Sequence, residues 1–179
     1  MVSSVKDMTT TDTTAAPDAT TEAPVTVPVR LDIEKAAPGF SAAMNRLHRA
    51  AEAELDRVGF DARLRDLVRL RASQLNGCAY CVDLHTTDAL AAGEHPQRVT
   101  AVPVWRETPF FTARERAALD LAEQVTLVAQ TRVPDAVWDE AARHFTPDEL
   151  GALVAALTTI NAWNTINVTT RTWNPTLQA

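Results

Sequence analysis

The stretch LRDLVRLRASQLNGCAYCVDLHTTDALAAG, residues 64–93, decides the fold and holds both cysteines of the chain. Its first half repeats apolar residues at three- and four-residue steps, which is typical of one buried face of a helix. Asn76 and Gly77 interrupt this pattern, and a second helical pattern covers residues 78–92 until Gly93, a glycine suited to a left-handed position, ends it. We predict two helices joined by a tight bend, with the cysteines at the start of the second.

Upstream of this stretch, the sequence predicts a helix over PGFSAAMNRLHRAAEAEL, residues 38–55. Apolar residues recur there with helical spacing, and Gly59 follows as a stop. We expect the buried face of this helix to consist of Phe40, Met44, Leu47, Ala51 and Leu55.

Downstream, two capping boxes mark helix starts. Thr112 with Glu115, and Thr146 with Glu149, have the Thr-x-x-Glu spacing in which each residue can bond the other's backbone N–H. A brief strand-like alternation is visible only over residues 99–105, and the chain has only 5 glycines. The sequence therefore predicts an all-α fold of about six to eight helices. The predicted helices after residue 93 cover 113–130, 134–144 and 147–171.

The chain divides into a tail and one domain. Residues 1–28 are rich in Thr, Ala and Pro and have too few large apolar side chains to offset the entropy lost on ordering. The remaining residues are numerous enough to bury a sizeable core. We predict a disordered tail over 1–28 and one all-helical domain over 29–179.

The charge of the chain limits the classes of partner. Its net charge is −6 and its pI is about 5.2, whereas nucleic acids and anionic membranes bind mainly to clustered Lys and Arg. The one basic cluster, Arg63, Arg65, Arg69 and Arg71, spreads around a helix, so we expect solvated side chains or salt bridges between subunits. A membrane-spanning run and a secretory signal pattern are both missing from the sequence. We predict a cytoplasmic protein with no nucleic-acid or membrane partner.

The two cysteines and a histidine share one side of the second predicted helix. Cys78, Cys81 and His85 follow one another at steps of three and four residues, so the imidazole can reach the second sulfur. Both sulfurs lie in the first turn, where free N–H groups and the helix dipole favour an anion. We expect a thiol there to ionise more readily than a free cysteine. Its thiolate can attack a peroxide and form a sulfenic acid, which condenses with the neighbouring thiol.

Spacing alone leaves other roles open for the cysteines. A tetrahedral zinc would need Cys78, Cys81, His85 and a distant His95 or His48, because the chain has no second CxxC or HxxxH pair. Haem attachment requires a histidine directly after the second cysteine, a position that valine occupies here. Two buried, unreactive thiols are a further alternative, and a reducing compartment disfavours a permanent disulfide. We predict no metal and no organic cofactor.

The same residues resemble a known family. Residues 64–93 are similar to the core signature of the alkylhydroperoxidase (AhpD-like)/carboxymuconolactone decarboxylase family. Its peroxidase members carry an acidic residue twelve positions before a CxxC and a histidine four positions after it, as this sequence does. The resemblance continues through VWRETPFFTARERAALDLAEQVT and INAWNTINV and covers about residues 40–171. It implies an all-helical protein with its active site at the CxxC helix, assembled as a homo-oligomer, often a trimer or hexamer.

The resemblance also implies a role for each residue of the motif. Cys81 attacks the hydroperoxide, Cys78 resolves the sulfenic acid as a disulfide, and His85 belongs to a proton relay. The acidic relay residue falls on Asp66, where the peroxidases have glutamate; because its side chain is one methylene shorter, a bridging water to His85 is the expected substitute for direct contact. Tyr80 replaces a histidine that some members carry between the cysteines.

The function that the resemblance implies is a thiol-dependent hydroperoxide reductase. Its substrate would be a small hydroperoxide, and its reductant a dithiol or a protein. Two alternatives stay open: a lactone decarboxylase of the same family, although those members lack the working CxxC, and a non-enzymatic redox sensor in which the disulfide changes a surface.

Several other residues have default structural roles. The tryptophans are expected in the core or at subunit interfaces, and His48 and His144 are expected to be solvated. The asparagines near the end of the chain, which are spaced by three, are expected to cap loops or to pair across an interface. These two sets are Trp105, Trp138, Trp163 and Trp173, and Asn161, Asn164 and Asn167.

Overall fold

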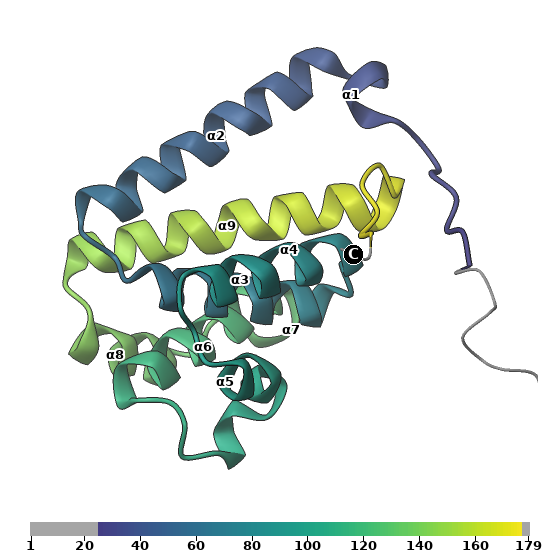
Figure 1. The fold of residues 1–179 in the computed structure, drawn as a ribbon. Helices are drawn as coiled ribbons and strands as arrows, with labels where there is room; N and C mark the ends of the chain where they lie inside the picture. Colours follow the sequence, from purple (N-terminus) through teal and green to yellow (C-terminus); the bar gives the residue numbers. More distant parts are fainter. Residues whose placement is uncertain (1–24, 177–179) are drawn as a thin grey trace, which may run out of the picture.

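The computed structural model describes residues 25–176, and every regular element in this range is a helix (Figure 1). The predicted tail, residues 1–28, lies outside the described residues except for its last four, which are exposed. None of the helices described here combines the length and the apolar character that a membrane span requires. The elements are α1 (Ile33–Ala36), α2 (Pro38–Arg57), α3 (Ala62–Asn76), α4 (Ala79–Ala91), α5 (Pro96–Ala101), the 3-10 helix η1 (Val102–Glu107), α6 (Ala113–Thr126), α7 (Val128–Thr131), α8 (Asp135–His144) and α9 (Pro147–Thr170).

Helix α3 is at the centre of the packing. It contacts α4, α6 and α9, while α2 packs against α9 from the other side (Figure 1). A fully buried leucine contributes about 1.5–3 kcal/mol relative to an exposed one, so the leucines shared by α3, α6 and α9 hold α3 firmly in place. These side chains, all at most 1% exposed, are Leu67, Leu70, Leu119, Leu121, Leu153 and Leu157.

Local signals in the sequence set several helix starts, whereas the helix predicted over 113–130 ends at Thr126 and the short α7 follows it. The Asp61 carboxylate accepts the N–H of Leu64 at the start of α3, and both capping boxes are formed at the starts of α6 and α9. Gly93 follows α4 with a φ of 84°, in the left-handed region that glycine adopts without strain. The all-α prediction is confirmed, and seven of the α-helices in the described range have six or more residues.

The strand-like alternation over residues 99–105 is misleading. These residues form the end of α5 and most of η1, because His95 and Pro96 begin a helix just before them. Val99, Val102 and Trp105 are all buried, and their spacing of three matches one helical turn.

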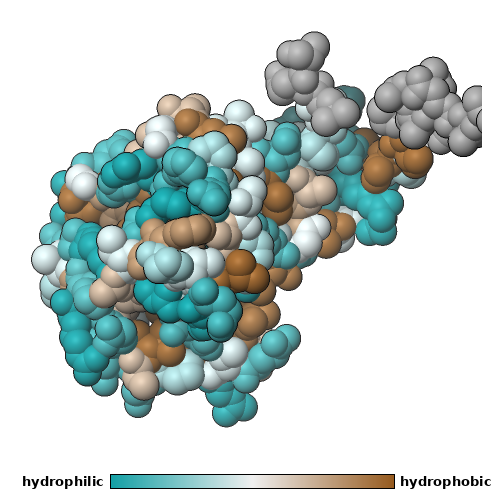
Figure 2. All heavy atoms as spheres, turned by 60° about the horizontal axis from the view of Figure 1, so that its bottom comes forward, coloured by the Kyte–Doolittle hydropathy of each residue, from teal (hydrophilic) through white to brown (hydrophobic). Residues whose placement is uncertain are grey.

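The predicted face of α2 is only partly buried. Met44, Ala51 and Leu55 are buried, whereas Phe40 is 50% and Leu47 is 47% exposed. Helix α2 packs mainly along α9, with further contacts from α1 and from the arginines of α3 at Glu52, and these contacts leave Phe40 and Leu47 partly uncovered. The face of the molecule in Figure 2 likewise mixes hydrophilic and hydrophobic residues.

The basic cluster on α3 is largely neutralised within the chain, and the prediction of solvated side chains or contacts between subunits is wrong for most of it. Arg65 and Arg69 pair with Glu52 of α2, and Arg71 pairs with Glu123 of α6. These arginines therefore tie α3 to its neighbours.

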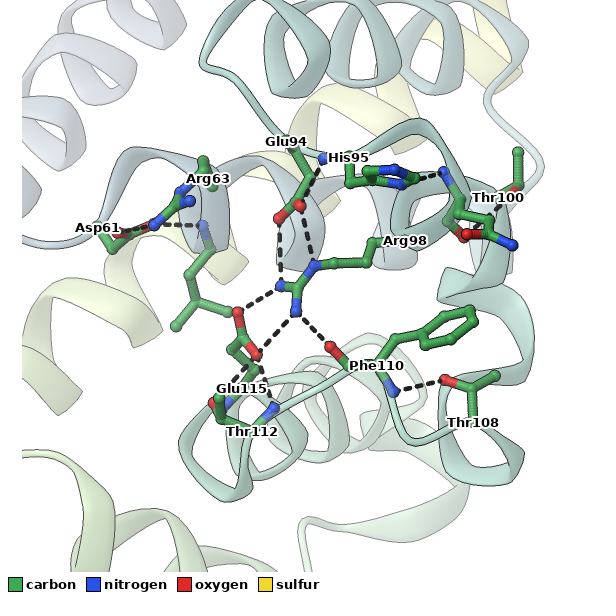
Figure 3. Close-up of polar contacts among 12 residues, drawn as sticks. Asp61, Arg63, Glu94, His95, Arg98, Thr100, Thr108, Phe110, Thr112 and Glu115 are labelled. Carbon is green, nitrogen blue, oxygen red and sulfur yellow. Dashed lines mark hydrogen bonds and ion pairs between the residues drawn. The ribbon is translucent and has the colours of Figure 1, made fainter.

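A second ionic cluster fastens α5 to the start of α6 (Figure 3). The guanidinium of Arg98 donates to Glu94 at 2.8 Å, to Glu115 and to the backbone oxygen of Phe110. Burial alone would raise the pKa of Glu115, but the hydrogen bonds from Arg98 and Thr112 outweigh burial and lower it overall. Glu94 is only 6% exposed, so its charge depends on Arg98 for compensation.

Replacing Arg98 with Met should lower the free energy of unfolding by about 2–4 kcal/mol at pH 7, because a buried carboxylate loses its partner. Because folding lowers the pKa of Glu115, its carboxylate stabilises the folded state. This stabilisation is fully present above the pKa that Glu115 has in the unfolded chain, and it is lost as the pH falls through the lower pKa of the folded chain. The difference between wild type and R98M in urea unfolding should therefore shrink toward acid pH. A difference that grows there would contradict this account.

Candidate active site

The bend between α3 and α4 presents the first cysteine at a helix start. Gly77 has a φ of 68°, which allows the chain to turn sharply after α3. The N–H of Cys78 then donates to the backbone oxygen of Ser73 at 3.0 Å. Cys78 is the N-cap of α4, and its Sγ accepts the N–H of Cys81 at 3.4 Å. A sulfur therefore takes the position in which an oxygen side chain usually caps a helix.

The two cysteines form a disulfide, with their Cα atoms 5.3 Å apart. Both are buried: Cys78 is 1% and Cys81 is 4% exposed. The pair is therefore oxidised in this structure, and a reductant would convert it to two thiols.

The imidazole of His85 and the carboxylate of Asp66 lie together in the interior. Nδ1 of His85 is 3.4 Å from Oδ1 of Asp66, a distance too short for a bridging water between these two atoms. The orientation does not make a hydrogen bond, and Nδ1 has no other hydrogen-bond partner among the described residues. The pair is buried, with side chains 7% and 11% exposed respectively, and can exchange a proton after a small adjustment.

A second acidic group, Asp88, lies beside this pair. Burial raises the pKa of Asp88, and the negative charge of Asp66 raises it further. Asp66, His85 and Asp88 each offer one ligand atom, and these atoms lie within 4.8 Å of one another, so this is the group in the described chain that could hold a metal ion. His95 is not part of it, because its ring accepts the N–H of Gln97 at the start of α5.

Cys81 and His85 line one cavity of about 270 Å³. Trp163 of α9 and Trp173, which follows α9, give it an aromatic wall, and their rings meet edge to face with centroids 5.6 Å apart. The remaining lining residues include both apolar and charged side chains. They are Glu34, Asn45, His48, Arg69, Tyr80, Leu84, Ala156, Thr159 and Ile160.

His48 lies in this cavity rather than in solvent, contrary to the prediction. It is half-buried, and its ring meets Trp163 edge to face with centroids 6.3 Å apart. Burial lowers the pKa of His48; Glu52 opposes this effect, and the charge of Arg69 adds to it. Among the tryptophans, Trp105 is buried in the core and Trp138 is 43% exposed. Trp163 and Trp173 instead line the cavity.

Cys78 lines a second cavity, also of about 270 Å³, which Cys81 does not line. Arg30, Arg171 and Asn167 are among its other lining residues. Tyr80 and Trp173 line both cavities. The two cysteines, predicted to share one stripe of the helix, therefore border different cavities.

The asparagines of α9 bind the bend within the same chain, and sequence reasoning missed this role. Asn76 donates its side-chain amide to Asn161 at 2.7 Å and to Asn164 at 2.9 Å. Asn164 in turn donates to the hydroxyl of Ser73 at 3.1 Å. Their spacing of three signalled one helix face, but not what that face contacts.

Asn167 continues this row as far as the cysteines. Its Nδ2 lies 3.7 Å from Sγ of Cys78 and 2.9 Å from the backbone oxygen of Trp173. Its Oδ1 accepts the backbone N–H of Trp173 at 2.9 Å. The side chain is buried, so one amide joins a cysteine to the segment after α9.

Comparisons with known proteins identify relatives of this chain. Residues 38–124 match the model of the carboxymuconolactone decarboxylase family. The protein YdfG of Bacillus subtilis (strain 168), described as uncharacterized, is 40% identical over 104 residues, which are 58% of this chain and 71% of YdfG.

Two solved structures extend the comparison. A protein of Agrobacterium tumefaciens, described as a putative antioxidant defence protein AhpD, is 35% identical, with a TM-score of 0.76 over 84% of this chain and 100% of its own. The debrominase Bmp8 is 20% identical, with a TM-score of 0.64 over 75% of this chain and 70% of its own, and shares the fold alone.

Proposed function

Because the chain belongs to the carboxymuconolactone decarboxylase family, in which it is similar to a putative antioxidant protein, we propose that it is a thiol-dependent hydroperoxide reductase. One observation carries the proposal: Cys81 of the CxxC pair lines a cavity together with His85, whose imidazole is paired with Asp66. A reactive sulfur, a proton carrier and space for a substrate thus meet at one place.

The reaction uses only groups of this chain and two substrates. The Cys81 thiolate attacks the terminal oxygen of the hydroperoxide, the O–O bond breaks, and the leaving alkoxide takes a proton to become an alcohol. The Cys78 thiolate then attacks the sulfur of the Cys81 sulfenic acid, which forms the disulfide and releases water. A dithiol or protein reductant supplies two electrons and two protons to restore both thiols.

His85 and Asp66 would handle the protons of this cycle. A histidine near a cysteine can accept the thiol proton and return it to the leaving oxygen, and a carboxylate holds the imidazole in place. At 3.4 Å, Asp66 is close enough for this role despite its short side chain. His85 is a positioned acid and base, while Asp66 acts through it.

The cavity favours a small and partly apolar hydroperoxide. Its volume of about 270 Å³ is at or below the range of typical ligand pockets, and Trp163 and Trp173 offer flat apolar surfaces. Exposed apolar side chains on α2 and α4, such as Phe40, Leu47 and Leu90, support assembly into a homo-oligomer.

Replacing Cys81 with Ser should abolish consumption of peroxide in the presence of excess dithiothreitol, because the attacking sulfur is gone. Replacing Cys78 with Ser should allow one oxidation of Cys81 without turnover, so that a sulfenic acid accumulates and reacts with dimedone. Equal rates in wild type and C81S would reject the proposal. Reversible oxidation of the wild-type thiols with no measurable turnover would instead favour a redox sensor.

Replacing Asp66 with Asn should lower kcat by about 100-fold, since general acid and base catalysis typically contributes 10²- to 10⁴-fold. Replacing it with Glu keeps the charge and should retain most of the activity. The exposed Asp83 of α4 offers a matched control, because D83N removes one negative charge from the same helix pair without contact to His85. Similar losses in D66N and D83N would show that only the overall charge matters.

Replacing Trp163 with Ala should lower kcat/KM for cumene hydroperoxide by about tenfold, because the aromatic wall is lost. The value for hydrogen peroxide, which is too small to use that wall, should change little. Trp138→Ala, at a half-exposed tryptophan of α8 that does not line the cavity, is the control. An equal loss for both peroxides in W163A would argue against an organic substrate.

A further inference from the structure

Asn167 belongs to the redox centre by its contacts, although it lies 86 positions after Cys81 in the sequence. Its side-chain amide is buried, and the distance from its Nδ2 to Sγ of Cys78 is 3.7 Å. Sulfur is large and diffuse, so its hydrogen bonds are longer than those of oxygen. The amide is therefore in hydrogen-bond contact with the sulfur of Cys78.

The orientation of this amide is fixed by its other partner. The backbone N–H of Trp173 donates to Oδ1 at 2.9 Å, and the backbone oxygen of Trp173 accepts from Nδ2 at 2.9 Å. If the amide were flipped, its NH₂ group would face the N–H of Trp173 and its oxygen would face the backbone oxygen of Trp173, so neither hydrogen bond could form. The NH₂ group must therefore point to Cys78, and its second hydrogen is the one that the sulfur receives.

Cys78 Sγ consequently accepts two N–H groups, the backbone N–H of Cys81 at 3.4 Å and the amide of Asn167. Two donors aimed at one buried atom stabilise negative charge there. Cys81 receives no such pair of donors in the described structure and instead faces the cavity that also holds His85. The two sulfurs thus have different chemical environments.

We propose that Asn167 is a positioning residue that stabilises Cys78 as the leaving thiolate when the disulfide is reduced, so that the reductant attacks Cys81. This inference rests on the proposed thiol chemistry and adds which of the two sulfurs the reductant attacks. The reductant thiolate bonds to Sγ of Cys81, the Cys78–Cys81 bond breaks, and its electron pair stays on Cys78. The second thiol of the reductant then displaces Cys81, and the reductant leaves as its own disulfide.

Other charged groups also face this region and must be separated from Asn167. Arg30, Arg171 and Tyr80 line the same cavity as Cys78, while His85, which is paired with Asp66, lines the cavity of Cys81. Charge effects over such distances weaken in salt, whereas a direct hydrogen bond is much less sensitive. Measurements in low and high salt therefore distinguish the two sources.

The test measures the pH midpoint of Cys78 ionisation in a C81S background, where Cys78 is the only thiol. Thiolate absorbance near 240 nm and the rate of alkylation by iodoacetamide both report it. Adding Asn167→Ala should raise the midpoint by about one pH unit, which corresponds to a tenfold lower thiolate population at pH values below the midpoint. High salt should not remove this shift. Asn161→Ala removes a similar amide from the same helix, one that contacts Asn76 at the bend and Thr126 but no sulfur, so it controls for loosening of the bend and should leave the midpoint unchanged.

A second readout uses both cysteines and does not involve peroxide. In the N167A variant with both cysteines intact, the equilibrium constant for reduction by dithiothreitol at about pH 8 should fall by up to tenfold, equivalent to about 30 mV. Asn167→Asp keeps the size of the side chain but replaces the donor with an acceptor, and should shift both readouts further in the same direction. Asn167→Asp also replaces N167A in both measurements if N167A does not fold.

Three results would overturn the inference. They are an unchanged midpoint in whichever Asn167 variant folds, an equal shift in N161A, and a Cys78 midpoint in C81S alone that is no lower than that of a free cysteine. Because none of these measurements uses peroxide, an inactive enzyme with the expected midpoints would reject the reductase function and leave the role of Asn167 intact.

Discussion

The buried amide of Asn164 fixes the relation between α3 and α9, and the geometry of the redox centre depends on it. The side chain is fully buried, accepts from Asn76 and donates to Ser73. A buried amide without partners costs about 1–3 kcal/mol, so only one register of the two helices satisfies it. That register places the bend at Gly77 against α9 and brings Asn167 within reach of Cys78.

Local signals in the sequence were sufficient for much of the fold. The caps at Asp61, Thr112 and Thr146 and the glycine turn before Cys78 each depend on a few neighbouring residues, and the structure forms all of them. The brief alternation over residues 99–105 does not mark a strand, because His95 and Pro96 begin a helix directly before it. Burial on α2 was also overestimated, because helical periodicity does not say how wide a partner helix is.

The site itself was only partly readable for a related reason. Cys78, Cys81 and His85 lie at the start of and within one short helix, so their spacing in the sequence is enough to predict that they are close in space. The cavity wall comes from Trp163 and Trp173, which depend on the packing of α9 and of the segment after it. The shorter side chain of Asp66 led us to expect a water between its carboxylate and His85. Close packing of α3 against α4 makes up for the missing methylene and leaves 3.4 Å between the two groups.

Cys81 lines one cavity and Cys78 lines another. The two cavities share Tyr80 and Trp173 but differ elsewhere: Trp163 lines the first alone, while two arginines and the amide of Asn167 line the second alone. Covalent inhibitors could exploit this asymmetry. An electrophile carried on a flat apolar scaffold would have access to Cys81, whereas an anionic one would be drawn to Cys78, so the choice of carrier rather than of warhead would decide which sulfur is modified.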